Sequence, residues 1–112
     1  MNLGAVEEIL TQYNHLFIKA YIFGSIVKGT NDEYSDVDLV LVRDTKESFF
    51  DRVREVLDLI HELPPTDLII YTEKEFNEFR DKKSGFFLQK IIGEGVEIEG
   101  KQKRSAEMAP AG

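Results

Sequence analysis

The sequence predicts a small α/β domain of the α+β kind, with a mixed sheet and helices packed mainly on one face. Short runs of β-branched and aromatic residues alternate along the chain with segments of helical periodicity. A long helical segment separates the strands predicted at 36–42 and 67–71, which favours a parallel crossover between them. A short loop with one helical turn joins the strands predicted at 17–23 and 36–42, so we expect a mixed sheet.

Residues 1–42 divide into a helix, a strand, a helical turn, a loop and a second strand. The first helix is indicated by an apolar stripe at helical spacing, which consists of Leu3, Val6, Ile9, Leu10 and Tyr13. The strand at 17–23 leads into a short helical turn at 25–29, where Gly29 acts as a stop. Polar turn formers fill the loop at 30–35, and the second strand follows at 36–42.

Two capping boxes are predicted in the second half of the chain. Asp44 with Glu47 would open a helix that runs to about residue 61, where Pro64-Pro65 stops it. After the strand at 67–71, Thr72 with Glu75 would open another helix. A last helix at 86–92 and a short edge strand at 96–98 complete the domain, and we expect the aromatic pairs Phe49-Phe50 and Phe86-Phe87 to belong to the core.

The composition indicates one domain, residues 1–99, followed by a disordered tail at 100–112 that is basic and then rich in Ala, Pro and Gly. A net charge of −7 disfavours binding to nucleic acid or to anionic membranes. The absence of cysteine excludes disulfides, thiolate metal sites and cysteine nucleophiles. Because the N-terminal segment does not resemble a signal peptide and no apolar run approaches the ~20 residues of a membrane span, we expect a cytoplasmic protein.

Three aspartates are the candidate metal ligands. Asp36 and Asp38 begin one strand and point to the same face, because strand side chains alternate. Two like charges side by side are unfavourable in a sheet unless they lie at a solvated strand end or hold a divalent cation between them. Asp67 begins the next strand, either as an ordinary turn residue or, in a parallel register, as a third carboxylate beside them. Hard oxygen ligands of this kind suit Mg²⁺.

Gly24, Ser25 and Lys28 are the candidate phosphate ligands. Glycine lets the backbone approach a phosphate closely, the start of a helical turn offers free N–H groups, and the Ser25 hydroxyl adds a donor. Lys28 is either a phosphate contact or a solvated side chain. A Walker P-loop is excluded, since Thr30-Asn31 stand where Lys-Ser/Thr is required, and Ser25 lacks the surroundings of a nucleophile elbow.

The motif Gly24-Ser25, followed by Asp36-Val37-Asp38 and an isolated Asp67, resembles the nucleotidyltransferase superfamily that includes DNA polymerase β. The short chain is similar to the minimal nucleotidyltransferase (MNT) branch over about residues 3–98. The resemblance implies a nucleotidyltransferase fold and a metal-dependent transfer of a nucleoside monophosphate, usually AMP from ATP, to a hydroxyl group.

The resemblance also implies a role for each candidate. Gly24, Ser25 and Lys28 would bind the nucleotide. Asp36 and Asp38 would hold two Mg²⁺ ions, with Mn²⁺ as the alternative metal. Asp67 would bind the catalytic metal and help to deprotonate the attacking hydroxyl.

MNT proteins often pair with a small helical HEPN protein as antitoxin and toxin, so the resemblance implies such a partner as the acceptor. A domain of 112 residues has little room for an acceptor site of its own, so a HEPN partner or a second copy would complete it. Two functions stay open: an enzyme that modifies its partner, and an antitoxin that neutralises its partner by contact with little or no catalysis. Transfer to a small molecule such as an aminoglycoside generally needs a further substrate domain.

Overall fold

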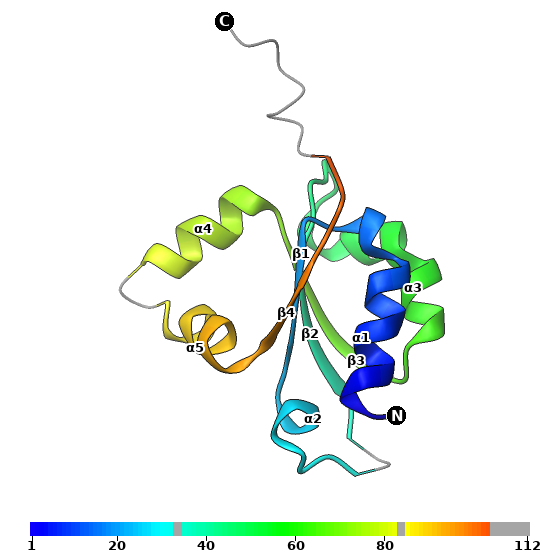
Figure 1. Cartoon of the computed structure of the whole chain (residues 1–112). Coiled ribbons are helices and arrows are strands. Elements are labelled where there is room, and N and C mark those ends of the chain that lie inside the picture. Colours follow the sequence, from blue (N-terminus) through cyan, green and yellow to red (C-terminus); the bar gives the residue numbers. More distant parts are fainter. Residues whose placement is uncertain (33–34, 83–84, 104–112) are drawn as a thin grey trace, which may run out of the picture.

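The computed structural model describes residues 1–32, 35–82 and 85–103, which form a four-stranded sheet with helices on both sides (Figure 1). The strand order is β3-β2-β1-β4. Strand β1 (Lys19–Phe23) pairs antiparallel with β2 (Val37–Val42) and with β4 (Val96–Glu99), whereas β3 (Thr66–Tyr71) pairs parallel with β2. The predicted mixed sheet, its parallel crossover and the edge position of the last strand are confirmed.

One face of the sheet is covered by α1 (Leu3–Gln12), the 3₁₀ helix η2 (Phe49–Val56) and α3 (Leu57–Glu62). Helix α1 begins where Asn2 accepts a hydrogen bond from the Ala5 N–H at 2.9 Å. Alternate residues of β2 enter the core on this face together with the apolar stripes of the helices: Val6, Leu10, Val37, Leu39, Leu41, Val56 and Leu59. Two further short helices, η1 (Asn14–Leu16) and α2 (Ser25–Lys28), flank β1 in sequence.

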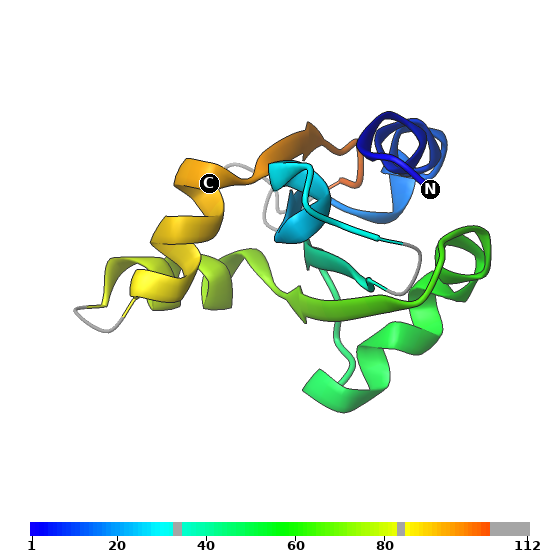
Figure 2. The ribbon, with the colours of Figure 1, turned by 90° about the horizontal axis from the view of Figure 1, so that it is seen from below.

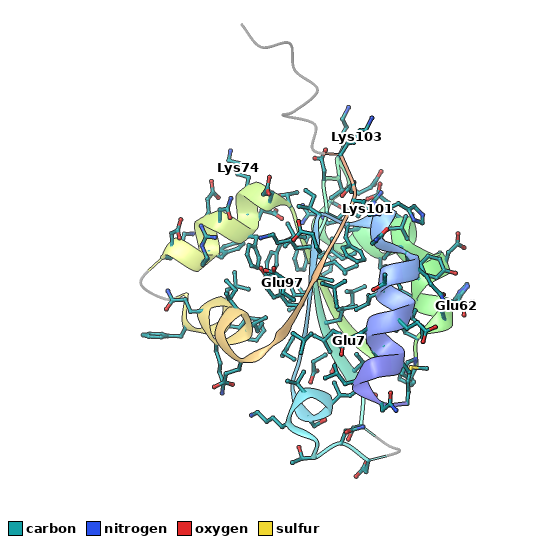
Figure 3. The ribbon with its side chains drawn as sticks, in the orientation of Figure 1. Glu7, Glu62, Lys74, Glu97, Lys101 and Lys103 are labelled. Carbon is teal, nitrogen blue, oxygen red and sulfur yellow. The ribbon has the colours of Figure 1, made fainter. Side chains whose placement is uncertain are left out.

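The other face carries a second, smaller core under α4 (Glu73–Asp81) and α5 (Phe86–Glu94) (Figures 1 and 2). Its members come from β1 and the residue before it, from β2 and from the two helices: Ile18, Tyr21, Val40, Val42, Phe76, Leu88 and Ile91. Tyr21 stacks on Phe76 and donates a hydrogen bond of 2.7 Å to Glu97 of β4. Glu97 is labelled in Figure 3. This is the face that Asp38 shares, and because α4 and α5 cover part of it, helices pack on both faces of the sheet rather than mainly on one.

The two predicted capping boxes have different outcomes. Thr72 and Glu75 form both hydrogen bonds of a capping box at the start of α4, as predicted. The box at Asp44 and Glu47 is wrong, because the helical segment begins only at Phe49 and continues as a 3₁₀ helix before α3. The Asp44 N–H instead donates a hydrogen bond of 2.9 Å to the Gln102 side chain, whose amide N–H donates one of 2.8 Å to the Asp44 carbonyl. The backbone at Asp44 is therefore non-helical where the helix was expected to begin.

The aromatic pairs expected in the core are exposed at the surface. Phe50 is 89% exposed, Phe49 and Phe87 are about half exposed, and Phe86 is mostly exposed. The buried positions of these segments belong to other residues, such as Val56 in η2 and Leu88 in α5. Phe50 and Phe86 therefore lie at the surface, whereas Phe49 and Phe87 are half exposed and each contacts an aromatic ring of the sheet, Tyr71 and Phe23 respectively.

The tail predicted from Gly100 is described as far as Lys103. The backbone N–H groups of Gly100, Lys101 and Gln102 donate hydrogen bonds of 2.9, 2.7 and 3.0 Å to carbonyls between Asn14 and Ile18. These residues continue along the folded domain, and the rest of the predicted tail lies outside the described residues. Within the described ranges, the helices are too short or too polar to cross a membrane.

A buried ion pair fixes η2 and α4 against the edge strand β3. The Arg52 guanidinium bonds both carboxylate oxygens of Glu75, at 2.5 and 3.1 Å, and donates to the Ile70 carbonyl at 3.0 Å and the Glu47 carbonyl at 3.1 Å. Arg52 is only 7% exposed. Because Arg52 donates to it, the pKa of Glu75 is held below its usual range.

Candidate functional site

Strands β2 and β3 begin side by side, and this brings the predicted aspartates into one region. Asp38 and Asp67 are direct partners in the parallel register, and Asp36 immediately precedes β2. Asp36 and Asp67 are exposed, whereas Asp38 is half-buried. The neighbouring positions of Asp38 and Asp67, which the sequence predicted from a parallel register, are therefore present in the structure.

The surroundings of Asp38 disfavour its ionised form. The pKa of Asp38 is raised, first by burial and then by the negative charges of Asp67 and Asp36. As the side chains stand, no three His, Cys, Asp or Glu groups within the described ranges surround a point where a metal ion could bind. The donor set consists of hard carboxylate oxygens and so fits Mg²⁺ in its chemistry, but a shared shell would require these side chains to turn toward a common point.

Gly24 occupies a backbone conformation that only glycine adopts without strain. Its φ of 81° and ψ of −153° lie in a region that is essentially closed to other residues. A Cβ atom at this position would overlap the carboxylate of Asp38, which packs directly over the Gly24 backbone. Phe23, the last residue of β1, is the antiparallel partner of Asp38 near the start of β2. A side chain at position 24 would therefore disturb the packing between these two strand ends.

The predicted helical turn after Gly24 is confirmed as α2. Ser25 is its first residue and is partly buried, and its carbonyl accepts a hydrogen bond of 3.0 Å from the Thr30 N–H. Gly29 ends the turn in the left-handed conformation, with a φ of 74°, as the sequence predicted for a stop. Lys28 is the last residue of α2 and is exposed.

A pocket of about 280 Å³ joins the predicted residues to a helix that sequence reasoning did not connect with them. Three predicted site residues line it, Gly24, Lys28 and Asp38. The remaining lining residues come from the end of β1 and from α5: Phe23, Phe87, Lys90 and Ile91. Their spacing on α5 indicates one helix face, but no sequence pattern relates that face to a motif about 50 residues earlier.

A second hollow of about 280 Å³ lies on the Asp36 side of the motif. Its polar lining includes Asn31, Asp32, Ser35 and Asp36, and Pro64-Pro65 forms another part of its wall. Asp38 and Asp36 thus line different hollows. The acidic lining of this second hollow distinguishes it from the pocket beside Asp38, which contains two lysines.

Comparison with known proteins identifies similar sequences and structures. Residues 5–104 match the family model described as "Polymerase beta, Nucleotidyltransferase". A crystal structure of a "putative nucleotidyltransferase" from Sulfolobus solfataricus is 30% identical, and the similarity covers 67% of each chain with a TM-score of 0.44. No match was found among curated proteins.

Proposed function

Because the chain belongs to the Polymerase beta nucleotidyltransferase family, we propose that it transfers AMP from ATP to a hydroxyl group of a partner protein. The observation that carries this proposal is the register of β2 and β3, which sets Asp38 beside Asp67, together with the packing of the Asp38 carboxylate over the backbone of Gly24. Family membership supports nucleotidyl transfer in general. The nucleotide, the acceptor and the metal are the parts that we propose.

The reaction requires an in-line displacement at the α-phosphorus of ATP. The acceptor oxygen forms the new P–O bond, the bond to the bridging oxygen of the β-phosphate breaks, and pyrophosphate leaves. Asp67 is exposed beside Asp38, so its carboxylate is in the proposed position to take the proton of the acceptor hydroxyl. Gly24, Ser25 and Lys28 would hold the phosphates, with Lys28 as the cation among them.

Asp36 and Asp38 would hold divalent metal, and Asp67 would share it. Three carboxylates beside a polyphosphate repel it, and burial together with the charges of Asp67 and Asp36 already raises the pKa of Asp38. When bound, two Mg²⁺ ions would neutralise this charge and favour ionisation of the acceptor hydroxyl. Through the metal that they hold, the carboxylates would orient the α-phosphate of the nucleotide toward the acceptor hydroxyl.

The two hollows give the two substrates separate approaches to the aspartates. The lysine-bearing pocket beside Asp38 suits an anionic nucleotide, whereas the acidic hollow beside Asp36 does not. We assign the acceptor to the Asp36 side. Since that hollow has a volume of only about 280 Å³, a second chain would supply the acceptor hydroxyl, and a helical HEPN-type protein is the partner we propose.

The test is to incubate the chain with ATP, Mg²⁺ and a candidate partner, such as the product of the neighbouring reading frame, and to measure the intact masses of both chains. We expect the partner to gain the mass of one AMP, and Asp36→Asn and Asp38→Asn to abolish this gain. Asp58→Asn, which changes an exposed acid at the start of α3, is the matched control and should retain it.

The outcome separates the proposed enzyme from a protein that acts by contact. If the partner is bound and neutralised but its mass never changes, and if Asp38→Asn neutralises it equally well, the chain acts by contact and the proposed transfer is wrong. If AMP appears instead on a small molecule without any partner, the assignment of a protein acceptor is wrong.

A further inference from the structure

Helix α5 supplies three of the seven residues that line the pocket beside Asp38, although it lies outside the motif. Phe87, Lys90 and Ile91 are three and four residues apart and line the pocket from one helix face, opposite Gly24 and Lys28. Figure 2, which shows the molecule of Figure 1 from below, places α5 near the short helix α2. The Phe23 and Phe87 rings meet edge to face, with their centroids 5.9 Å apart, so the aromatic wall crosses from the sheet to the helix.

The pocket combines apolar walls with a cationic rim. Two phenylalanines and Ile91 form the apolar part, and both lysines are exposed at its edge. Among the described residues that line it, Asp38 is the sole carboxylate. A flat heteroaromatic ring suits the apolar part, because aromatic side chains pack against base faces regardless of sequence. A polyphosphate suits the rim, where two ammonium groups can approach it.

The size of the pocket limits how much of a nucleotide it can hold. Its volume of about 280 Å³ lies just below the ~300–1,000 Å³ that is common for small-molecule sites. A nucleoside can occupy it, but the phosphate tail must then extend along the open side, where Lys28 and Lys90 lie. The acidic hollow near Asp36 would repel such a tail, so charge selects the α5 side for the nucleotide.

We propose that α5 forms the outer wall of the nucleotide site, where Phe87 packs against the nucleobase and Lys90 contacts the phosphate tail. This inference rests on the proposed function. It adds that two side chains of one helix contact different parts of the nucleotide, Phe87 the base and Lys90 the phosphates. Lys90 brings a second cation to a site in which Lys28 is the cation of the motif.

The division is tested with fragments of the nucleotide. Binding of ATP, adenosine and tripolyphosphate is measured in Mg²⁺ buffer by displacement of a fluorescent ATP analogue. Phe87→Ala should weaken ATP and adenosine about tenfold and leave tripolyphosphate unchanged, because it removes only the stacking wall. Lys90→Gln should weaken ATP and tripolyphosphate about fivefold, reduce the salt dependence of their binding, and leave adenosine unchanged.

Matched variants distinguish these contacts from general effects on α5. Phe86→Ala removes a neighbouring phenylalanine that is 76% exposed and does not line the pocket. Lys74→Gln removes a lysine of α4 that points away from the sheet (Figure 3). Both should bind all three probes like the unmodified chain. Phe87→Leu keeps apolar volume beside Phe23, so it should keep the fold and still lose adenosine binding.

Two results would overturn the inference. The first is that the unmodified chain binds ATP, but the Phe87 and Lys90 variants either bind every probe equally well or lose all three probes to the same extent. In that case Phe87 and Lys90 do not contact separate parts of the nucleotide as proposed. The proposed function would survive that result. If the unmodified chain binds no ATP at all, the proposed function and the inference are both wrong.

Discussion

The contact between Gly24 and Asp38 gives the sharpest prediction for this site. Gly24→Ala should destabilise the domain in two ways. The backbone region at φ 81° and ψ −153° costs a residue with a side chain ~1–3 kcal/mol. The new Cβ would also overlap the Asp38 carboxylate, and since Asp38 is half-buried and can move partly aside, we take the low end of the ~1–3 kcal/mol range for overpacking. The expected total is about 2–4 kcal/mol.

Gly29→Ala is the matched control for backbone strain. Gly29 also has a positive φ, 74°, but a Cβ there would meet no atom within 4 Å, so the expected loss is about 1 kcal/mol. Urea denaturation measures both losses, and displacement of a fluorescent ATP analogue measures nucleotide binding. Gly24→Ala should weaken ATP binding because the carboxylate is pushed out of place, whereas Gly29→Ala should leave it nearly unchanged.

A double-mutant cycle isolates the contact itself. In an Asp38→Ala background the clashing carboxylate is gone and only its Cβ remains, 3.4 Å from the built atom, so Gly24→Ala should then cost only the backbone strain. We expect a coupling energy of about 1 kcal/mol or more between the two positions. A coupling energy near zero, together with equal losses for Gly24→Ala and Gly29→Ala, would refute this account of the site.

Three further predictions concern stability. Asp38→Asn should stabilise the domain at pH 7 while abolishing transfer. Folding raises the pKa of Asp38 above its ordinary 3.8, so folding disfavours the ionised carboxylate. In urea denaturation, the gain in the free energy of unfolding over the unmodified chain should appear as the pH rises through that raised pKa and vanish below about pH 3.8. Arg52→Met should cost about 2–3 kcal/mol, less than the ~3–5 kcal/mol of a fully buried pair, since the Glu75 side chain is 33% exposed. Because the pKa of Glu75 is lowered from its ordinary 4.5, its ionised carboxylate stabilises the fold above about pH 4.5, and this stability is lost on acidification. Urea denaturation over a pH series should show a smaller loss on acidification for Arg52→Met than for the unmodified chain. Gly93→Ala, near the end of α5 with open space around the new Cβ, should gain about 0.5–1 kcal/mol in the same assay and bind ATP unchanged.

The parts of the fold that follow from local rules were predictable from the sequence. The alternation in β2 placed Val37 and Leu39 on one face and Asp38 on the other, and the second capping box fixed the start of α4. The failed box at Asp44 shows where such rules stop. Its residues match the pattern, but the Gln102 side chain, nearly 60 positions away, takes the backbone of Asp44. A contact at that separation leaves no local signal.

The candidate site was predictable as far as its motif extends. The register that pairs Asp38 with Asp67 follows from a parallel crossover, and the positive φ of Gly24 follows from a turn that only glycine allows. Phe87 and Lys90 were not predictable, because an aromatic pair on an amphipathic helix is usually core. Their place in the pocket depends on how α5 packs against β1, which is a tertiary result.

Folding alone does not account for the residues at positions 24 and 38. Asp38 shares its face of β2 with Val40 and Val42, so an apolar residue at position 38 would extend the smaller core. The aspartate instead has a pKa that is raised by burial and by two neighbouring negative charges. Gly24 adopts a conformation that a more typical turn would avoid, and the space this leaves is filled by that same carboxylate. A backbone conformation open only to glycine and a carboxylate with a raised pKa therefore meet at a single contact, and perturbed carboxylates are expected where a site is selected for chemistry. A chain selected only to bind a partner through its surface would have no reason to retain this pair, so the contact favours a catalytic function.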